Sequence, residues 1–361
     1  MKTLAVKYRP GSFSEVVEQG PIKAILQEQV ATGTFKNAYL FTGGAGTGKT
    51  TCARILAKDI NEGKGTPVEI DAASNNGVDN VRDIIDNSRF KAIDAKYKVY
   101  IIDECHMLSN GAWNAMLKLL EEPPAFTIFI FCTTDPQKIP ATILSRVQRY
   151  DFQRLSFDAI VERLRHIIFE ERDEQLRERA EQEGRDIDLL EAEADSSEYM
   201  VPEEGALEYI AKIADGGMRD AITMLDKVLS YSREITVENV VGALGTVNYD
   251  LMVDLANHII DRQSKEAIGV VEQVYRKGLD LKQFVKQFCE FLLDVRKYQM
   301  FKSFEYLKVP QTMQKSMDTF LDVEPEFIRQ MLHKFLRINQ DIKWETVPKP
   351  IIESEVLLLC E

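Results

Sequence analysis

Residues 43–50 read GGAGTGKT, and this stretch decides the fold because it fits the phosphate-binding pattern G-x-x-x-x-G-K-S/T. Glycines let backbone N–H groups curl around phosphate oxygens without a clashing Cβ atom. An apolar strand candidate at residues 37–43 precedes the stretch. A helix that begins at about Lys49 follows it and points its positive N-terminal end at the same anion. We therefore predict a triphosphate site in a strand–loop–helix unit.

Three side chains of this stretch have separate tasks in the predicted site. Lys49 brings a full charge to the β- and γ-phosphates, Thr50 offers a hydroxyl to Mg²⁺, and Thr51 can bond the α-phosphate side. The alternative is a Gly-rich turn with a chance lysine, which the flanking strand and helix argue against. The residues predicted to bind ATP are Gly43, Gly44, Ala45, Gly46, Thr47, Gly48, Lys49, Thr50 and Thr51.

A second motif, KVYIIDECH at residues 98–106, is a buried strand that ends in two carboxylates. Asp103 is predicted to hold Mg²⁺ through water, so that Thr50 and Asp103 form the metal site. Glu104 is predicted to orient or deprotonate the attacking water. A solvated acidic turn is the alternative. We interpret His106 as a packing or capping residue, because the other histidines form no ligand-spaced cluster with it.

The remaining pattern divides the chain in two. Apolar runs at residues 37–43, 66–72, 98–104 and 127–134 alternate with helical stretches, which predicts a parallel sheet buried on both faces. After Phe152 the strand pattern stops, and an amphipathic helix begins with Ser156 as its N-cap. Two further helices are separated at residues 216–217, and from about Gly245 the spacing predicts a helix bundle.

Composition fits a globular protein of two or three domains. The chain has 361 residues, of which 45% are hydrophobic and 29% are charged. It has no run of about 18 apolar residues and no apolar stretch of signal-peptide length at its start, so a cytoplasmic location is expected. The five cysteines form no CxxC pair, and we expect reduced thiols and no zinc.

Acidic residues gather in one segment. The net charge is −13, but residues 170–204 contain 15 acidic and 4 basic residues, a local charge of −11, whereas residues 1–150 contain 16 acidic and 18 basic residues. A solvated helix extension, a loop and an acidic contact arm all remain open for this insert. The near-neutral first 150 residues leave a nucleic-acid partner possible.

Five ordered stretches together carry a family resemblance: VKYRPGSFSEVVEQ (6–19), EIDAASNNGVDNVRDI (69–84), YKVYIIDECHMLSNGAWNAMLKLLEEPP (97–124), TTDPQKIPATILSR (133–146) and DGGMRDAITMLD (215–226). The chain resembles the gamma/tau (DnaX) subunits of bacterial DNA polymerase III, which are AAA+ proteins. The resemblance is dense from about Leu4 to Asp226. It implies an α/β P-loop AAA+ domain with helices on both faces of a parallel sheet (residues 1–154). A small helical lid with the acidic insert (residues 155–244) and a helical oligomerisation collar (residues 245–361) would follow.

The resemblance also implies roles for three residues away from the P-loop. Thr134 matches sensor 1, a polar group near the γ-phosphate or water, with Thr133 as the fallback and backbone capping as the alternative. Arg146 matches the arginine finger that reaches the adjacent subunit's ATP, although Val147 replaces the usual cysteine; a surface salt bridge is the alternative. Arg219 matches sensor 2, and an ordinary helix-surface arginine is the alternative.

Two further groups are carried over from the family. Tyr8, Arg9, Pro10 and Val17 match the segment that borders adenine, and simple packing of the N-terminal arm is the alternative. Lys118, Arg82 and Asn75 match the face that tracks DNA phosphates, and a merely solubilising role is the alternative. Such DNA contacts are salt-sensitive and independent of base sequence.

The implied function is an ATP- and Mg²⁺-dependent clamp-loader subunit without a polymerase site. With other loader subunits, about five in all, it would open a sliding clamp and place it on primer–template DNA, with no membrane partner. The family's four-cysteine zinc module is absent between the P-loop helix and residue 69. Because the chain ends at ESEVLLLCE, we expect loading only, as in the short gamma form. Another AAA+ DNA motor (helicase or branch-migration type) and an ATP-binding scaffold without turnover are the rival functions.

Overall fold

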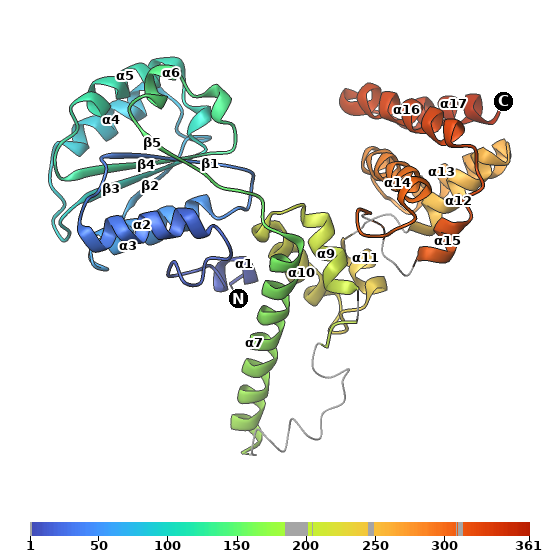
Figure 1. The fold of residues 1–361 in the computed structure, drawn as a ribbon, viewed down its shortest axis with the longest axis horizontal. Helices are drawn as coiled ribbons and strands as arrows, with labels where there is room; N and C mark the ends of the chain where they lie inside the picture. The colour runs from blue at the N-terminus through green and yellow to red at the C-terminus, as the bar shows by residue number, and fades with distance from the viewer. Residues whose placement is uncertain (1, 185–200, 204, 245–248, 308, 310–312) are drawn as a thin grey trace. The chain divides into compact units, whose positions relative to one another are not determined.

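The computed structural model describes residues 2–184, 201–203, 205–244, 249–307, 309 and 313–361 (Figure 1). The chain divides into two compact units. The first comprises Met1–Glu171 with Ala214–Asp226, and the second comprises Arg172–Ile213 with Lys227–Glu361. The part of the acidic insert at residues 185–200 and 204 lies outside the described residues.

The first unit contains a five-stranded parallel sheet in the order β2-β3-β4-β1-β5. Its strands are β1 (Ala38–Thr42), β2 (Val68–Asp71), β3 (Lys98–Asp103), β4 (Thr127–Thr133) and β5 (Gln148–Asp151). The four predicted strands are confirmed. The sequence analysis missed β5, because its residues, QRYD, are mostly polar. Thr42 pairs with Thr133 and Ile102 with Phe131, so β1, β3 and β4 end at the same edge of the sheet.

Helices cover both faces of this sheet, as predicted. Figure 1 shows α2 (Gly20–Thr32) and α3 (Lys49–Ile60) on one face, and α4 (Val78–Ser88), α5 (Asn110–Glu121) and the short α6 (Ala141–Leu144) on the other. Because strand side chains alternate between faces, Tyr39 and Phe41 pack under α2 and α3. Leu40 faces the opposite side, in the cluster that holds Trp113 of α5. The sheet edge where the strands end is therefore supported by a buried hydrophobic cluster on each face of the sheet.

Helical segments at the two ends of the first unit frame that edge. The N-terminal arm contains α1 (Leu4–Lys7), and α7 runs from Phe157 to Glu183. Ser156 caps α7 as predicted, because its Oγ accepts from the Ala159 N–H at 3.3 Å. Helix α7 carries residues 170–183 of the acidic insert, so this part is helical. The predicted break near residues 216–217 is confirmed, since α9 spans Ala206–Ala214 and α10 spans Met218–Tyr231.

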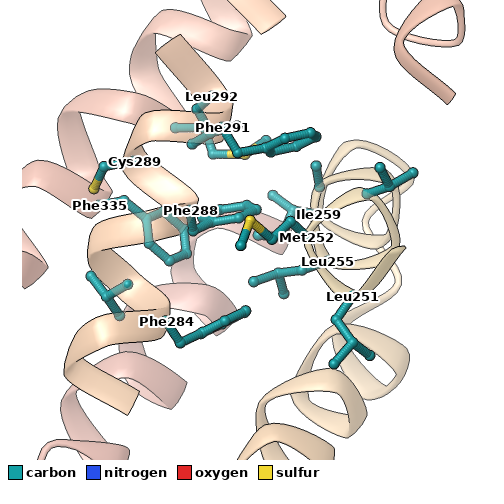
Figure 2. Close-up of a cluster of buried hydrophobic side chains, with 14 of the residues drawn as sticks. Leu251, Met252, Leu255, Ile259, Phe284, Phe288, Cys289, Phe291, Leu292 and Phe335 are labelled. Carbon is teal, nitrogen blue, oxygen red and sulfur yellow. The ribbon is translucent and has the colours of Figure 1, made fainter. Parts of the chain in front are cut away.

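Helices are the only regular elements among the described residues of the second unit, which confirms the predicted bundle. After α11 (Val237–Leu244) come α12 (Tyr249–Ile260), α13 (Ser264–Arg276), α14 (Leu281–Phe301), α15 (Gln314–Asp318), α16 (Pro325–Asp341) and α17 (Lys349–Cys360). Figure 2 shows side chains of α14, among them Phe288, packed against Leu255 of α12 and Phe335 of α16. The Phe288 and Phe335 rings meet edge to face, 4.5 Å apart. None of the described helices combines the length and apolarity that a membrane crossing needs.

Candidate nucleotide-binding site

The predicted phosphate loop leaves β1 and enters α3 at Lys49. Gly43, Gly46 and Gly48 have positive φ angles of 145°, 69° and 99°, which L side chains rarely adopt. At Gly43 a Cβ atom would also lie 3.0 Å from the Phe152 Cβ and closer still to the Phe152 carbonyl oxygen. The loop therefore needs glycine for its backbone angles and, at Gly43, for space.

Lys49 lies inside this loop and is buried. Its ammonium donates to the carbonyl oxygens of Gly43 at 2.8 Å and Gly44 at 2.6 Å. Burial lowers the pKa of Lys49, and this outweighs the opposite effect of the nearby Glu104 and Asp103 carboxylates. A buried ammonium beside a cradle of backbone that a Cβ would fill fits a bound phosphate, because an ammonium–phosphate contact is stronger than one to a neutral carbonyl.

Thr50 and Asp103 come together although 53 positions separate them. The Thr50 hydroxyl donates to Asp103 Oδ2 at 2.8 Å, and the other carboxylate oxygen accepts from the Glu104 N–H at 3.0 Å. A hydroxyl and a carboxylate next to a phosphate loop are oxygen donors of the kind that Mg²⁺ takes with substrate phosphates. The predicted metal pair therefore fits that ion.

Glu104 occupies a strained position at the end of β3. Its φ and ψ angles of 46° and 41° are left-handed, which is costly for a residue with a side chain and is common at functional sites. Thr134 donates its hydroxyl to Glu104 Oε2 at 2.9 Å. His106 Nδ1 lies 3.2 Å from the same oxygen and 3.1 Å from the Thr133 hydroxyl. Two neighbours thus fix the carboxylate that is predicted to act on water.

His106 is a neighbour of Glu104 that the sequence analysis did not place in the site. Its ring lies beside Glu104, the residue that precedes the short helix η1 (Cys105–Met107), and the packing or capping role stays a prediction. The D-E-C-H string contained the only signal, a histidine two positions after the carboxylate.

A pocket opens above the loop, wholly within the first unit. It brings together the predicted residues Tyr8, Arg9, Pro10, Val17, Ala45, Gly46, Thr47, Gly48, Lys49, Thr50, Thr51, Asp103, Glu104 and Arg219. Residues of no recognised motif complete it, including Arg54, Leu155 and Arg163. Gly43, Gly44, Thr134 and Arg146 are not part of its wall.

The N-terminal arm that borders the pocket is fastened at three points. The Leu4 N–H donates to Asp226 at 3.2 Å, and Lys7 pairs with Glu171 at 2.7 Å. The Arg163 guanidinium donates to the Tyr8 carbonyl oxygen at 3.2 Å. Burial, together with Glu171, raises the pKa of the Tyr8 hydroxyl, which therefore stays neutral. The arm forms a fixed wall of the pocket.

The predicted sensor 2 segment lies directly on the phosphate loop. The Met218 N–H, at the start of α10, donates to the Gly46 carbonyl oxygen at 3.1 Å. A Cβ atom at Gly46 would lie 3.0 Å from the Gly217 Cα. Glycine at position 46 therefore allows this close approach, which brings Arg219 to the pocket wall.

Arg146 lies away from this pocket, in the turn between α6 and β5. Its guanidinium donates to Glu121 Oε1 and to the Thr142 carbonyl oxygen, each at 2.6 Å, and to the Ser145 hydroxyl at 3.1 Å. The side chain is about one-third exposed, so it is accessible to a second molecule. Nothing about this placement brings it to the phosphate loop of its own protomer.

The three predicted DNA contacts lie on or before α4 and α5. Arg82 forms an exposed pair with Asp79 at 3.0 Å, and the Asn75 amide donates to the Asp71 carbonyl oxygen at 3.0 Å. Lys118 is exposed on α5. The two helices pack closely, since a Cβ at Gly111 of α5 would lie 2.7 Å from Val78 of α4. Arg82 and Lys118 therefore belong to one packed pair of helices, and their DNA role stays a prediction.

The described residues show neither a disulfide nor a second metal-binding group. All five cysteines are buried free thiols. Burial raises the pKa of Cys52 to about 12, and it raises the pKa of Cys105 and Cys132 as well. Among the described residues, no three His, Cys, Asp or Glu side chains gather as a metal-binding group.

Comparison with known proteins places the chain in a family. Three family models match it in succession: "DNA polymerase III, delta subunit" at residues 67–156, "DNA polymerase III clamp loader subunit, ATPase lid domain" at residues 195–234, and "DNA polymerase III subunits gamma and tau domain III" at residues 235–359. DNA polymerase III subunit tau of Bacillus subtilis (strain 168) is 36% identical over 380 residues, covering 98% of this chain and 62% of that protein. The chain belongs to the DNA polymerase III gamma/tau family.

A second curated relative agrees with this assignment. Subunit tau of Escherichia coli (strain K12) is 32% identical over 301 residues, which is 77% of this gamma/tau chain and 43% of that protein. The chain thus spans less than two thirds of either relative's length. A solved structure of the Thermotoga maritima RuvB Holliday junction branch migration motor aligns over 95% of this chain and 94% of its own, with 17% identity and a TM-score of 0.47. The parallel sheet of the first unit and the matched lid and domain III models confirm the AAA+ fold class implied by the motifs.

Proposed function

We propose that this gamma/tau-family chain is an ATP-hydrolysing clamp-loader subunit that opens a sliding clamp and places it on primer–template DNA in the cytoplasm. The observation that carries the proposal is the convergence of Lys49, Thr50, Asp103 and Glu104 at one edge of the sheet, beneath a pocket. Family membership supports the loading role. We propose residues 1–154 as the ATPase domain, 155–244 as the lid and 245–361 as the collar through which subunits assemble.

The chain's own residues suffice to bind ATP and to direct water at it. Lys49 exchanges its carbonyl partners for phosphate oxygens, and the backbone N–H groups of residues 44–49 surround the anion. Mg²⁺, held by Thr50 and through water by Asp103, would neutralise charge on the β- and γ-phosphates. Glu104 orients or deprotonates the attacking water. Thr134 and His106 keep that carboxylate in place.

Arg146 is proposed to act on a neighbouring subunit. It lies outside the pocket of its own protomer and is partly exposed. An arginine supplied from outside offsets charge on the transferring phosphoryl group, and in other ATP- and GTP-hydrolysing proteins it raises turnover by about a thousandfold or more. The lone subunit would then hydrolyse ATP slowly, and fast hydrolysis would require assembly. Arg219, at the predicted sensor 2 position, would couple the nucleotide state to the lid. The Met218–Gly46 hydrogen bond supports this role, because it joins the helix that carries Arg219 to the phosphate loop.

The proposal also includes contacts of this chain with DNA and with the sliding clamp. Lys118, Arg82 and Asn75 would follow DNA phosphates without reading bases, so binding should weaken steeply with salt. ATP then acts as a switch, because its γ-phosphate favours the arrangement that grips clamp and DNA, and its loss releases both.

An ATPase assay on the chain assembled with its partner subunits tests this function. Turnover is measured alone, with a sliding clamp, and with clamp and primed circular DNA. Stimulation by the last combination is expected, with clamp retained on the DNA. Lys49→Ala should abolish ATP binding, whereas Arg146→Ala should bind ATP and lose the stimulated turnover. Strand separation or translocation without clamp retention would instead show a DNA motor, and binding without turnover would show a scaffold.

A further inference from the structure

We propose that Glu121 is a positioning residue, which holds the Arg146 guanidinium in the orientation that meets a neighbouring protomer's ATP. The inference rests on the proposed function, because it concerns the same site between subunits. Glu121 is the last residue of α5 and Arg146 follows α6, so the pair joins segments 25 positions apart. No motif in the sequence predicts this contact.

The hydrogen bonds of Arg146 fix its guanidinium and still leave part of it available. A guanidinium has five N–H groups. Two are directed at the Thr142 carbonyl oxygen and the Ser145 hydroxyl, both within its own turn, and one at Glu121 Oε1. Those three acceptors leave two N–H groups, the number that arginine uses in a paired contact to a phosphate. Of these three acceptors, Glu121 alone belongs to another element. It therefore fixes the position of the guanidinium relative to α5, whereas the other two fix it only relative to its own turn.

The exposure of the Arg146–Glu121 pair indicates that it orients the arginine and contributes little to the stability of the fold. The Arg146 and Glu121 side chains are 32% and 49% exposed. Ion pairs at such positions contribute little to the stability of a fold, because water solvates both partners. A long arginine side chain that is already immobilised, however, loses less freedom when it meets its target. Glu121 therefore serves the contact that Arg146 makes with a phosphate.

The adjacent residue provides a matched control. Glu122 is also a glutamate, is exposed, and directly follows α5. The Arg146 guanidinium bonds Glu121 and not Glu122. Replacing one or the other removes the same charge from nearly the same place. Only the replacement of Glu121 removes one of the acceptors of the Arg146 guanidinium.

Two inactive variants that complement each other make the test specific. A donor protomer with Lys49→Ala binds no ATP but keeps Arg146, and an acceptor protomer with Arg146→Ala binds ATP but supplies no arginine. In a mixture, ATP turns over only where a donor lies beside an acceptor. Glu121→Ala is then placed in the donor alone or in the acceptor alone, and kcat and KM are measured for each mixture.

We expect Glu121→Ala in the donor to lower the recovered kcat by roughly 10- to 100-fold with KM unchanged, the usual cost of a misplaced catalytic group. The same change in the acceptor should have no such effect. Glu121→Gln in the donor, which keeps the oxygen acceptor, should restore most of the turnover, and Glu122→Ala in the donor should leave it unchanged.

Three results would overturn the inference. Equal losses from donor and acceptor placements would show a structural role for Glu121. A rise in turnover from the donor placement would show that Glu121 withholds Arg146. If the mixture of the two parent variants recovers no turnover at all, the site between subunits is wrong, and the proposed function fails before Glu121 is reached.

Discussion

Replacement of the first glycine of the phosphate loop tests whether its geometry is as restrictive as the structure shows. In Gly43→Ala the new Cβ meets the Phe152 backbone and side chain, and the residue must keep a φ of 145°. The unfavourable backbone angle costs about 1–3 kcal/mol, and forcing an extra methyl group into filled space costs about 1–3 kcal/mol more. The first unit should therefore lose about 2–6 kcal/mol of unfolding free energy.

Two other glycines of the loop separate the two contributions. At Gly48 an added Cβ meets nothing within 4 Å but φ is 99°, so Gly48→Ala should cost only the backbone part, about 1–3 kcal/mol. At Gly44 the nearest atom would be Thr47 Cγ2 at 3.7 Å, an ordinary contact, and φ is not positive. Gly44→Ala should therefore stay within about 0.5 kcal/mol of the unsubstituted chain.

Tryptophan fluorescence during denaturant unfolding can report the first unit alone. The chain has two tryptophans: Trp113 is buried against Phe131 in the first unit, and Trp344 is exposed in the second. In a Trp344→Phe background, the remaining signal follows the sheet and the phosphate loop. The expected order of destabilisation is Gly43, then Gly48, then Gly44. Equal costs for Gly43→Ala and Gly44→Ala would refute the reasoning.

Three further substitutions test other parts of the chain. His106→Ala should lower kcat by about tenfold without changing ATP affinity, because Glu104 loses one of two contacts that fix its carboxylate; an unchanged kcat in steady-state kinetics would contradict this. Arg163→Ala removes the donor to the Tyr8 carbonyl oxygen. It should raise the Kd for ATP about fivefold, equivalent to about 1 kcal/mol, and an unaltered Kd in an ATP titration would argue against this. Phe288→Ala leaves a cavity in the helical bundle and should cost about 3–5 kcal/mol in the second unit, while ATP titration of the folded protein stays normal; a loss of affinity would count against separate units.

The part of the site that sequence could predict depends on local chemistry and one rule of topology. The glycines, Lys49 and Thr50 are contiguous, so their loop follows from the pattern alone. Asp103 could be placed beside Thr50 because parallel strands end at one edge of a sheet, and the Thr50–Asp103 hydrogen bond agrees. Ser156 as a helix cap is likewise a local property, and it is confirmed.

The parts that sequence could not predict are tertiary. Arg163 and Leu155 reach the pocket from more than 100 positions beyond the phosphate loop, and neither belongs to a recognisable pattern. Strand β5 is a polar edge strand, so alternation of apolar residues does not mark it. The contact of Arg146 with Glu121 depends on how α5 ends relative to the next turn, which spacing does not reveal. Motifs predicted the phosphate loop, the N-terminal arm and Arg219, whereas Leu155 and Arg163 could be found only from the packing.

Helix α5 has a consequence for how neighbouring protomers influence each other. It begins at Asn110, six residues after Glu104, and its twelve residues make a rod about 18 Å long that ends at Glu121. Its first residue thus follows closely after Glu104, which is proposed to direct water in its own protomer, and its last residue bonds Arg146, which is proposed to act on the next protomer. A push on this strut from bound DNA would disturb both at once. Under the roles proposed for Glu104 and Arg146, a displacement of α5 in one protomer would therefore change hydrolysis both in that protomer and in its neighbour.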